Sequence, residues 1–281
     1  TTRSFLQQAL GLDVNMLSAK NLYGKTYLET GDYNKAMEHF SENLSNAESQ
    51  GNEAYIAHSL SNIGLVYQRK GEYLESIENY LRSYTIRSKI GDRLGMSFTL
   101  GNMAIIYHKR GEYNKALEQF QNCLEIQEDL EDISSMASTL NNIANIYLTR
   151  SEFDKALSMF HKSLEISKED NDNNKISILE GNIANIHTGL GDYNKALDKQ
   201  RNVLKLKEAL GDKRAIASTI NQIGINYHYL DKLKKALEYY NKAKIIRMEI
   251  EDLNGLAHSL FLIGIIYENL SHLGKARKFI E

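Results

Sequence analysis

The chain of 281 residues has 42% hydrophobic side chains and neither proline nor tryptophan, so no proline interrupts a helix. Its net charge of -2 provides no strong field that would attract nucleic acid or an anionic membrane. A single cysteine excludes an internal disulfide and favours a reducing compartment, and no apolar run reaches the ~20 residues of a membrane span. We therefore expect an all-α protein of the cytoplasm, with no membrane insertion and no nucleic-acid partner.

Two columns of residues recur at intervals of forty positions along the chain. The first column is aromatic and runs through Tyr27, Tyr67, Tyr107, Tyr147, His187, Tyr227 and Tyr267. The second marks a turn four residues later and runs through Gly31, Gly71, Gly111, Ser151, Gly191, Asp231 and Ser271. A fixed period of this length indicates stacked supersecondary units rather than one closed core.

Apolar residues at spacings of three and four predict one amphipathic helix before each turn and another after it. The first helices are expected at 14–30, 54–70, 94–110, 134–150, 174–190, 214–230 and 254–270, with the second helices between them. Loops such as Gly91-Asp92 place a side-chain acceptor where the next helix needs an N-cap. Each unit is therefore predicted to be an antiparallel helix pair.

Small residues recur in both helices of each predicted pair. They occupy one column at Gly24, Gly64, Ala104, Ala144, Ala184, Gly224 and Gly264, and another at Ala36, Ser76, Ala116, Ala156, Ala196, Ala236 and Ala276. A residue without bulk lets two helix axes approach to the short end of the usual range of about 8 to 10 Å. We expect the tyrosine column to pack in the core between the helices, and isoleucines such as Ile143 and Ile183 to fill the seam with the next unit.

The repeats are predicted at approximately 14–50, 54–90, 94–130, 134–170, 174–210, 214–250 and 254–281, which makes residues 1–281 a single array. Both ends are expected to cut through a repeat. Residues 8–11 align with residues 208–211 at the end of a later second helix, and Ala276 lies in the opening of a second helix that stops at Glu281. We expect a fragment of a longer protein, which leaves room for an effector domain in the same full-length chain.

The Gly or Ala column, the Tyr three residues later, the turn Gly, and the Ala and Phe/Tyr columns of the second helix resemble tetratricopeptide repeats (TPRs). The resemblance covers essentially the whole chain. Because the forty-residue period exceeds the common one of about thirty-four, the chain is most similar to the long-repeat subgroup. That subgroup includes kinesin light chains, the Leu-Gly-Asn adaptors of G-protein signalling, and bacterial arrays attached to kinases, cyclases or caspase-like proteases. The resemblance implies a right-handed superhelical solenoid of about seven antiparallel helix pairs, whose concave groove, lined by the first helices, holds peptides.

An amide side chain occupies the same first-helix position in five consecutive repeats: Asn62, Asn102, Asn142, Asn182 and Gln222. Asn145 and Asn185 add a second amide three residues on, which lies on the same helical face. An Asn side chain carries a donor and an acceptor, so it can bond an extended peptide backbone of any sequence. The resemblance to kinesin light chains and to the Leu-Gly-Asn adaptors supports this role, because similarly placed asparagines hold the ligand main chain in those proteins. We predict that these amides bind peptide; the alternative is a solvated polar face inherited when the units duplicated.

Two cations, Arg69 and Lys109, fall in an inward column near the ends of two first helices, with Lys70, Arg110 and Arg150 beside them. This cluster predicts a site for an acidic segment of the ligand. The alternative is that the cations only complement the helix dipole, since positive charge near a helix C-terminus is favourable without any ligand. A neighbouring inward column is mixed and contains His58, Phe98, Ser138, Ile178, Ser218 and His258, with no arginine.

Residues that could catalyse a reaction or hold a metal show no known pattern. The eight histidines lack metal-ligand spacing, and Cys123 lies in a column of small packed residues. We therefore predict no enzyme, no metal and no cofactor. The expected function is a protein–protein interaction scaffold that binds an extended peptide or a partner surface in the concave groove. The alternatives are a regulatory sensor array that controls an attached kinase, cyclase or protease, and a structural spacer.

Overall fold

The computed structural model describes residues 16–270, and within that range every regular element is an α-helix. The helices are α2 (Met16–Glu29), α3 (Tyr33–Ser49), α4 (Glu53–Lys70), α5 (Tyr73–Ile90), α6 (Arg93–Lys109), α7 (Tyr113–Asp129), α8 (Ile133–Thr149), α9 (Phe153–Glu169), α10 (Asn173–Gly189), α11 (Tyr193–Leu210), α12 (Lys213–Tyr229), α13 (Leu233–Glu249) and α14 (Leu253–Asn269). The predicted first helices are confirmed, since each begins and ends within two residues of its expected bounds. The repeat fragment at residues 8–11 and the second helix containing Ala276 lie outside the described residues.

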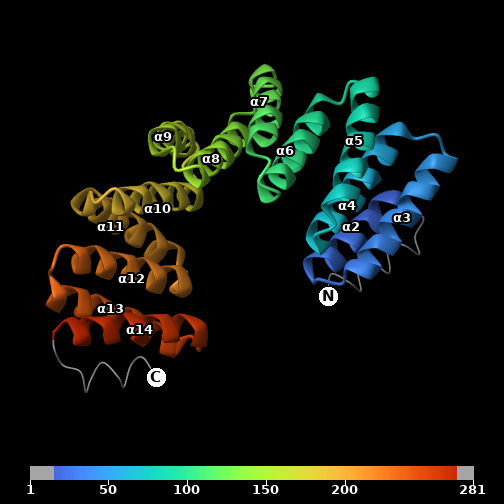
Figure 1. Cartoon of the computed structure of the whole chain (residues 1–281). Helices are drawn as coiled ribbons and strands as arrows, with labels where there is room; N and C mark the ends of the chain where they lie inside the picture. Colours follow the sequence, from blue (N-terminus) through green and yellow to red (C-terminus); the bar gives the residue numbers. More distant parts are fainter. Residues whose placement is uncertain (1–15, 271–281) are drawn as a thin grey trace. The chain divides into compact units, whose positions relative to one another are not determined.

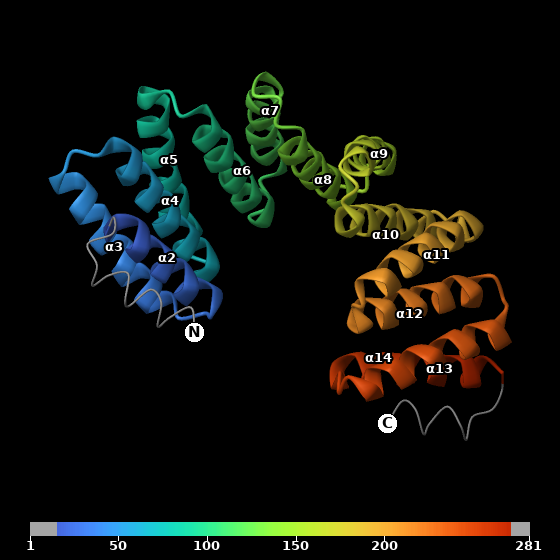
Figure 2. The same cartoon turned by 180° about the vertical axis from the view of Figure 1, so that it is seen from behind.

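The chain forms two compact units, residues 1–146 and 147–281, and the boundary between them falls inside α8. In the first unit each helix from α2 to α7 packs against the next, and α2 also contacts α4. In the second unit each helix from α9 to α14 packs against the next, and α12 also contacts α14. Both views show α2 to α5 side by side in one unit and α11 to α14 side by side in the other (Figures 1 and 2). Each unit is therefore a stack of helix pairs in which contacts run between neighbours, as expected for a solenoid.

The loops have the backbone conformations that the sequence predicts. The turn inside each described pair has one residue with positive φ, and this residue is Gly at four of its six positions, as at Gly111 (φ 77°). Ser151 and Asp231 adopt the same left-handed conformation at φ 59° and 57°. Between pairs, Asp92 caps α6 by accepting a hydrogen bond from the amide of Gly95 at 2.9 Å. The predicted turn column and N-caps are thus confirmed in the described residues.

The buried core runs along an aromatic column of the second helices. This column consists of Phe40, Tyr80, Phe120, Phe160 and Tyr240, each no more than 1% exposed. The small column of the first helices faces it: a Cβ atom on Gly24 would lie 2.5 Å from Phe40, and one on Gly224 would lie 2.5 Å from Tyr240. Since real Cβ contacts are longer, the small residues are what admit the rings between the two helices.

The tyrosine column lies at the edge of this core, which corrects the expectation that it packs inside. Tyr27, Tyr67, Tyr107, Tyr147 and Tyr267 are half-buried, and only Tyr227 is fully buried among the described members. The reason is that the column lies in the last turn of the first helix, where solvent reaches the ring. A lysine of the following second helix covers it instead: Lys115 Nζ lies 5.5 Å from the centroid of Tyr107, and the pairs Lys35–Tyr27, Lys155–Tyr147 and Lys235–Tyr227 are arranged similarly.

Candidate functional site

One stripe of each first helix carries most of the predicted binding residues. In α4 the stripe consists of His58, Asn62, Leu65 and Arg69, and their spacings of four, three and four residues put them on one side of the helix. Equivalent positions occur at intervals of forty residues in the other first helices. We call this stripe the first-helix face. Its parts on α2, α4, α6 and the α8 residues up to 146 belong to the first unit, and its parts on α10, α12 and α14 belong to the second.

The amide of Asn62 is used inside the protein. Its side chain is buried, and its Nδ2 atom donates to Asn21 Oδ1 on α2 at 2.6 Å. The same nitrogen lies 3.2 Å from Nδ1 of His58, one turn earlier on α4. Asn62 therefore joins the first two repeats to each other, and its amide hydrogens both face protein acceptors.

The next two members of the ladder are more accessible. Asn102 is half-buried, its Nδ2 atom donates to the main-chain carbonyl of Phe98 at 2.9 Å, and its side-chain oxygen has no partner among the described residues. Asn142 is half-buried as well, and its amide has no hydrogen-bond partner within residues 16–270. Phe98 itself is 53% exposed on the same face of α6. The first unit thus presents two amides and an aromatic ring that are accessible to a ligand.

The remaining predicted amides differ among themselves. Asn145 is half-buried and donates from Nδ2 to the carbonyl of Asn141 at 2.9 Å, so it is turned back onto its own helix. In the second unit, Asn182 and Gln222 are half-buried and Asn185 is exposed. All three of these second-unit side chains are therefore accessible to solvent. They lie on two helices, Asn182 and Asn185 on α10 and Gln222 on α12.

The predicted cations Arg69 and Lys109 are exposed in the last turns of α4 and α6. Neither forms an ion pair with another described residue. The cations that follow them in sequence behave differently, because each pairs with a glutamate across the turn: Lys70–Glu72 at 2.9 Å, Arg110–Glu112 at 2.8 Å and Arg150–Glu152 at 2.6 Å. Only Arg69 and Lys109 of this predicted cluster therefore have their charge available to a partner.

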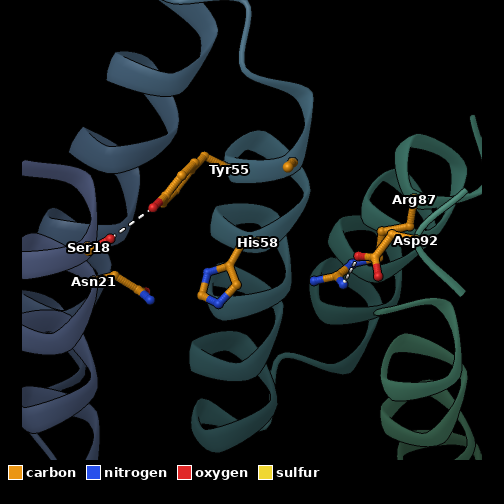
Figure 3. A pocket seen from close by; sticks show the side chains of 7 residues that line it. Ser18, Asn21, Tyr55, His58, Arg87 and Asp92 are labelled. Atoms are coloured by element: carbon orange, nitrogen blue, oxygen red, sulfur yellow. Dashed lines mark hydrogen bonds and ion pairs between the residues drawn. The ribbon is translucent and has the colours of Figure 1, made fainter. Parts of the chain in front are cut away.

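The structure also contains a pocket that the sequence did not indicate. It has a volume of about 370 Å³ and lies in the first unit, where α2, α4 and the loop before α6 meet (Figure 3). Its lining consists of Ser18, Asn21, Ala54, Tyr55, His58, Arg87 and Asp92. These residues come from three successive repeats and no short motif connects them. The one available signal was His58, which is a histidine on the first-helix face one helical turn before the ladder amide Asn62.

The polar groups of the pocket are joined by hydrogen bonds. The hydroxyls of Ser18 and Tyr55 lie 2.8 Å apart, and Nη1 of Arg87 donates to Oδ2 of Asp92 at 2.6 Å. Burial lowers the pKa of His58 below its usual value, and the positive charges of Lys25 and Arg87 lower it further, while Asp92 opposes them. The imidazole is therefore neutral at neutral pH.

The guanidinium of Arg87 is held where the next repeat makes room for it. A Cβ atom on Gly95 would lie 1.5 Å from Nη1 of Arg87, so only glycine fits there without displacing the arginine. A related pair occurs in the second unit, where buried Arg247 donates to the carbonyl of Gly255 and a Cβ atom on Gly255 would lie 2.9 Å from Cδ of Arg247. In both units the arginine and the glycine occupy the same positions of the forty-residue repeat. The sequence could therefore have shown that the two residues occur together.

Other classes of site find little support in the described residues. Between residues 16 and 270, no three His, Cys, Asp or Glu side chains come together as metal ligands. Cys123 is buried, its Sγ atom lies 3.3 Å from the hydroxyl of Ser97, and burial raises the pKa of its thiol. None of the helices from α2 to α14 combines the length and the apolar character that a bilayer-spanning helix needs.

Comparison with solved structures identifies similar folds at low sequence identity. A signal transduction ATPase with a tetratricopeptide repeat sensor from Pyrococcus horikoshii is 17% identical, with a TM-score of 0.84, over 99% of this chain and 44% of that protein. A Rap protein complexed with competence and sporulation factor is 15% identical, with a TM-score of 0.63, over 92% of this chain and 76% of that one. A putative kinesin light chain from Podosopora anserina is 14% identical, with a TM-score of 0.59, over 69% of this chain and 96% of that one.

The family models give the more direct assignment. No curated protein sequence matches the chain. One tetratricopeptide repeat model matches residues 55–129, 135–209 and 174–244, and a second matches residues 17–48. These matches cover well over half of the 281 residues and coincide with the observed stack of helix pairs. The chain therefore belongs to the tetratricopeptide repeat family.

Proposed function

We propose that this tetratricopeptide repeat domain binds an extended peptide along the first-helix face, as a protein-interaction module. The observation that carries the proposal is the amide of Asn142, which is half-buried and has no partner among the described residues. A polar group in such a position gains most when a ligand or an ordered water satisfies it. In the proposed mode, the peptide backbone bonds to Asn142 and to the side-chain oxygen of Asn102 in the preceding repeat.

Two further features of the first unit support a peptide of mixed character. The ring of Phe98 is 53% exposed one turn before Asn102, and exposed aromatic rings are common anchors in protein interfaces. Arg69 and Lys109, at the other end of the same face, carry positive charge that no described residue pairs with. We therefore propose a ligand with an apolar residue over Phe98 and an acidic end over Arg69 and Lys109. In its fold the chain is similar to the Rap protein that was solved with competence and sporulation factor.

The second unit carries its own set of proposed contacts. Asn182 and Asn185 on α10 and Gln222 on α12 are partly or fully accessible, and the first two lie three residues apart on one helix. An accessible amide pair at this spacing can bond both a donor and an acceptor of one extended backbone. We propose this amide pair as a separate contact of the second unit.

Selection of peptides from a displayed random library against the purified chain, followed by affinity measurement, tests the proposal. We expect Asn102→Ala with Asn142→Ala to weaken the selected peptide by about 1 to 2 kcal/mol, the usual cost of lost hydrogen bonds. The matched control is Asn34→Ala with Asn122→Ala, two asparagines of second helices that lie away from this face. Unchanged affinity for the Asn102 and Asn142 double variant would remove the proposed backbone contact.

Ionic strength separates the charged contact from the amide contact. Replacing Arg69 and Lys109 by alanine is expected to weaken binding mainly at low salt, because exposed charges are screened over a Debye length of about 10 Å at 0.1 M salt. The amide variants are expected to lose affinity equally at both salt concentrations. Arg82→Ala, an exposed arginine of α5, serves as the charge control.

A second function, sensing on behalf of an attached effector domain, is favoured by one observation. The chain is similar over 99% of its length to an ATPase with a tetratricopeptide repeat sensor, and it spans 44% of that protein. We expect that, in such a case, a full-length protein would change the activity of its effector on peptide addition, and that the Asn102 and Asn142 variant would abolish the change. Failure of both the library selection and this response would leave the structural spacer.

A further inference from the structure

Helices α11 to α13 of the second unit are basic, although the chain as a whole is not. Residues 193–249 contain 13 lysines and arginines and 6 aspartates and glutamates, whereas the whole chain contains 34 and 36. Several of these cations are paired within the unit, as in Lys242–Glu238 at 2.7 Å. Two others, Lys232 and Lys234, lie together at the start of α13, where they are exposed and pair with no described residue.

The start of α13 departs from the charge pattern of the other second helices. The residue before the helix is acidic in each of the five preceding repeats: Asp32, Glu72, Glu112, Glu152 and Asp192. In four of them this carboxylate forms an ion pair with a lysine three residues on, as in Glu112–Lys115 at 2.7 Å. In α13 the same position holds Lys232, so Lys235 has a like charge there instead of a partner. Like charges at this spacing and cations at a helix N-terminus are both unfavourable, so Lys232 does not serve the stability of the fold.

Exposed apolar side chains lie beside these lysines. Tyr229, three residues before Lys232, is 59% exposed, and its ring stacks on Tyr193 with 5.0 Å between the centroids. Leu190, three residues before Tyr193, is 48% exposed. Because Tyr193 begins α11 and Tyr229 ends α12, the stack brings the turns before α11 and α13 to one edge of the second unit. We call this edge the basic rim; it consists of Leu190, Tyr193, Tyr229, Lys232, Lys234 and Lys235.

The combination of cations and apolar groups on the basic rim indicates the kind of partner. Lysines without internal partners attract an anionic surface, and Asp231, the one carboxylate between Tyr229 and Lys235, offsets only part of their charge. A single-stranded nucleic acid would need a track of cations, whereas these lie within one helical turn, and it has no use for an exposed leucine. Lipid accepts leucine, and tyrosine is enriched at the level of the headgroups because its ring is apolar and its hydroxyl polar.

We propose that the basic rim binds the surface of an anionic membrane, with Lys232, Lys234 and Lys235 among the lipid headgroups and Tyr229 and Leu190 in the interfacial layer. Binding of this kind is peripheral and reversible, because each lysine near a charged bilayer raises the affinity only about fivefold. The proposal goes beyond the peptide-binding function. It uses none of the amides assigned to the peptide, so the two fail independently.

Fluorescence of the whole chain with vesicles tests the proposal. The chain has no tryptophan, so Tyr229→Trp places a single fluorophore on the basic rim. We expect its emission to shift to shorter wavelength with vesicles of equal parts phosphatidylserine and phosphatidylcholine, less so at high salt, and not with phosphatidylcholine alone. Phe98→Trp, at a similarly exposed ring of the first unit, is the control and should show no shift. No shift of Tyr229→Trp with the anionic vesicles, or an equal shift with the neutral ones, would overturn the proposal, and a response to oligouridylate or oligoglutamate instead would assign the rim to another partner.

Charge variants separate a membrane contact from a structural role. Lys232→Glu restores the carboxylate of the other repeats, so it should pair with Lys235 and slightly raise the melting temperature, while vesicle affinity measured by cosedimentation falls about 25-fold. Lys205→Glu, at an exposed lysine toward the other end of α11, changes the charge equally and should cost far less affinity. Asp231→Asn, which tolerates the left-handed turn (φ 57°), should strengthen binding about fivefold. Equal losses for Lys232→Glu and Lys205→Glu would contradict a contact specific to the basic rim.

Discussion

Phe120 and Tyr107 are two large rings of the same helix pair, and the structure gives them different weight. Phe120 is 1% exposed and stands in the buried aromatic column, whereas Tyr107 is half-buried under Lys115. A ring at the edge of a core leaves a gap that solvent and a flexible lysine can partly fill. A ring in the centre leaves a closed cavity, because packed helices relax only in part.

We predict that Phe120→Ala destabilises the protein by about 3 to 5 kcal/mol and that Tyr107→Ala costs about half as much. Urea denaturation of the two single variants measures the difference. Asn122→Ala, at an exposed position of α7, serves as the control and should change the free energy of unfolding little. Equal losses for the two ring variants would mean that the tyrosine column carries the core after all.

At the scale of an element, helix α6 contains two glycines with opposite roles. Gly95 lies under the guanidinium of Arg87, and an added Cβ atom would lie 1.5 Å from Nη1. Gly101 lies further along the same helix, and the nearest atom to an added Cβ there is Sγ of Cys123 at 3.8 Å. The first glycine serves the junction between two repeats, and the second only weakens its helix.

Gly101→Ala is therefore predicted to stabilise the protein by about 0.5 to 1 kcal/mol, the gain in helix propensity. Gly95→Ala is predicted to destabilise it, because Arg87 must leave its place beside Asp92. Thermal unfolding of both variants provides the comparison, and Gly95→Ala combined with Arg87→Ala should recover part of the loss. A stabilising Gly95→Ala variant would show that the arginine moves aside freely.

The pairing of α11 with α12 replaces an apolar contact by a buried polar one. Gln200 stands in the aromatic column of the second helices, and Asn226 stands where other repeats have Val66, Ile106, Ile146, Ile186 and Ile266. Asn226 Nδ2 donates to Gln200 Oε1 at 2.9 Å, and Thr188 donates to Asn226 Oδ1 at 3.0 Å. Both amides are buried, and Gln200 depends on Asn226 for its bond, whereas Asn226 Nδ2 also donates to the carbonyl of Gln222 at 3.0 Å.

We predict that Asn226→Ile alone and Gln200→Phe alone each destabilise the protein by about 1 to 3 kcal/mol, because the first leaves the buried amide of Gln200 unpaired and the second places a ring against the buried polar side chain of Asn226. The double variant restores the residue types of the other repeats, and Ala184 holds the position in its repeat that Ala104 holds in the repeat of Phe120. It should lose less than the sum of the two, with a coupling energy of about 1 to 2 kcal/mol. Additive losses in this double-mutant cycle would show that the two amides act separately.

At the scale of the whole molecule, the stability of each unit rests on contacts between neighbouring helices. The aromatic ring of Tyr240 belongs to a cluster formed by α11 to α14, and Tyr80 belongs to one formed by α5 to α7. In stacked repeats, stability is approximately a sum of repeat terms and neighbour terms, so damage stays largely local. Regions of such a protein can open separately under native conditions.

Tyr240→Ala is therefore predicted to reduce the hydrogen-exchange protection of amides in α12 and α13 strongly, and to leave α4 and α5 almost unchanged. Tyr80→Ala should produce the reverse pattern. Native-state exchange followed by mass spectrometry measures both variants. A uniform loss of protection over α2 to α14 would show that the array opens as one cooperative unit.

Much of the fold was determined by the sequence alone, because its causes are local. The forty-residue period, the positive-φ turns and the acceptors before each first helix act within a few residues of the chain, and a seven-fold recurrence makes them unambiguous. The small column facing the aromatic column is predictable for the same reason: both belong to one helix pair. The amide ladder likewise follows from the forty-residue spacing of its members in the chain.

Only the tertiary structure decided what each member of these columns does. Asn62 and Asn142 hold the same position in the repeat, yet Asn62 is bonded to Asn21 and His58 while Asn142 has no partner among the described residues. The pocket needs α2, α4, Arg87 at the end of α5 and the loop before α6 at once. A period in the sequence repeats a position but not its neighbours, and hydrogen bonding, burial and local charge are properties of the neighbours.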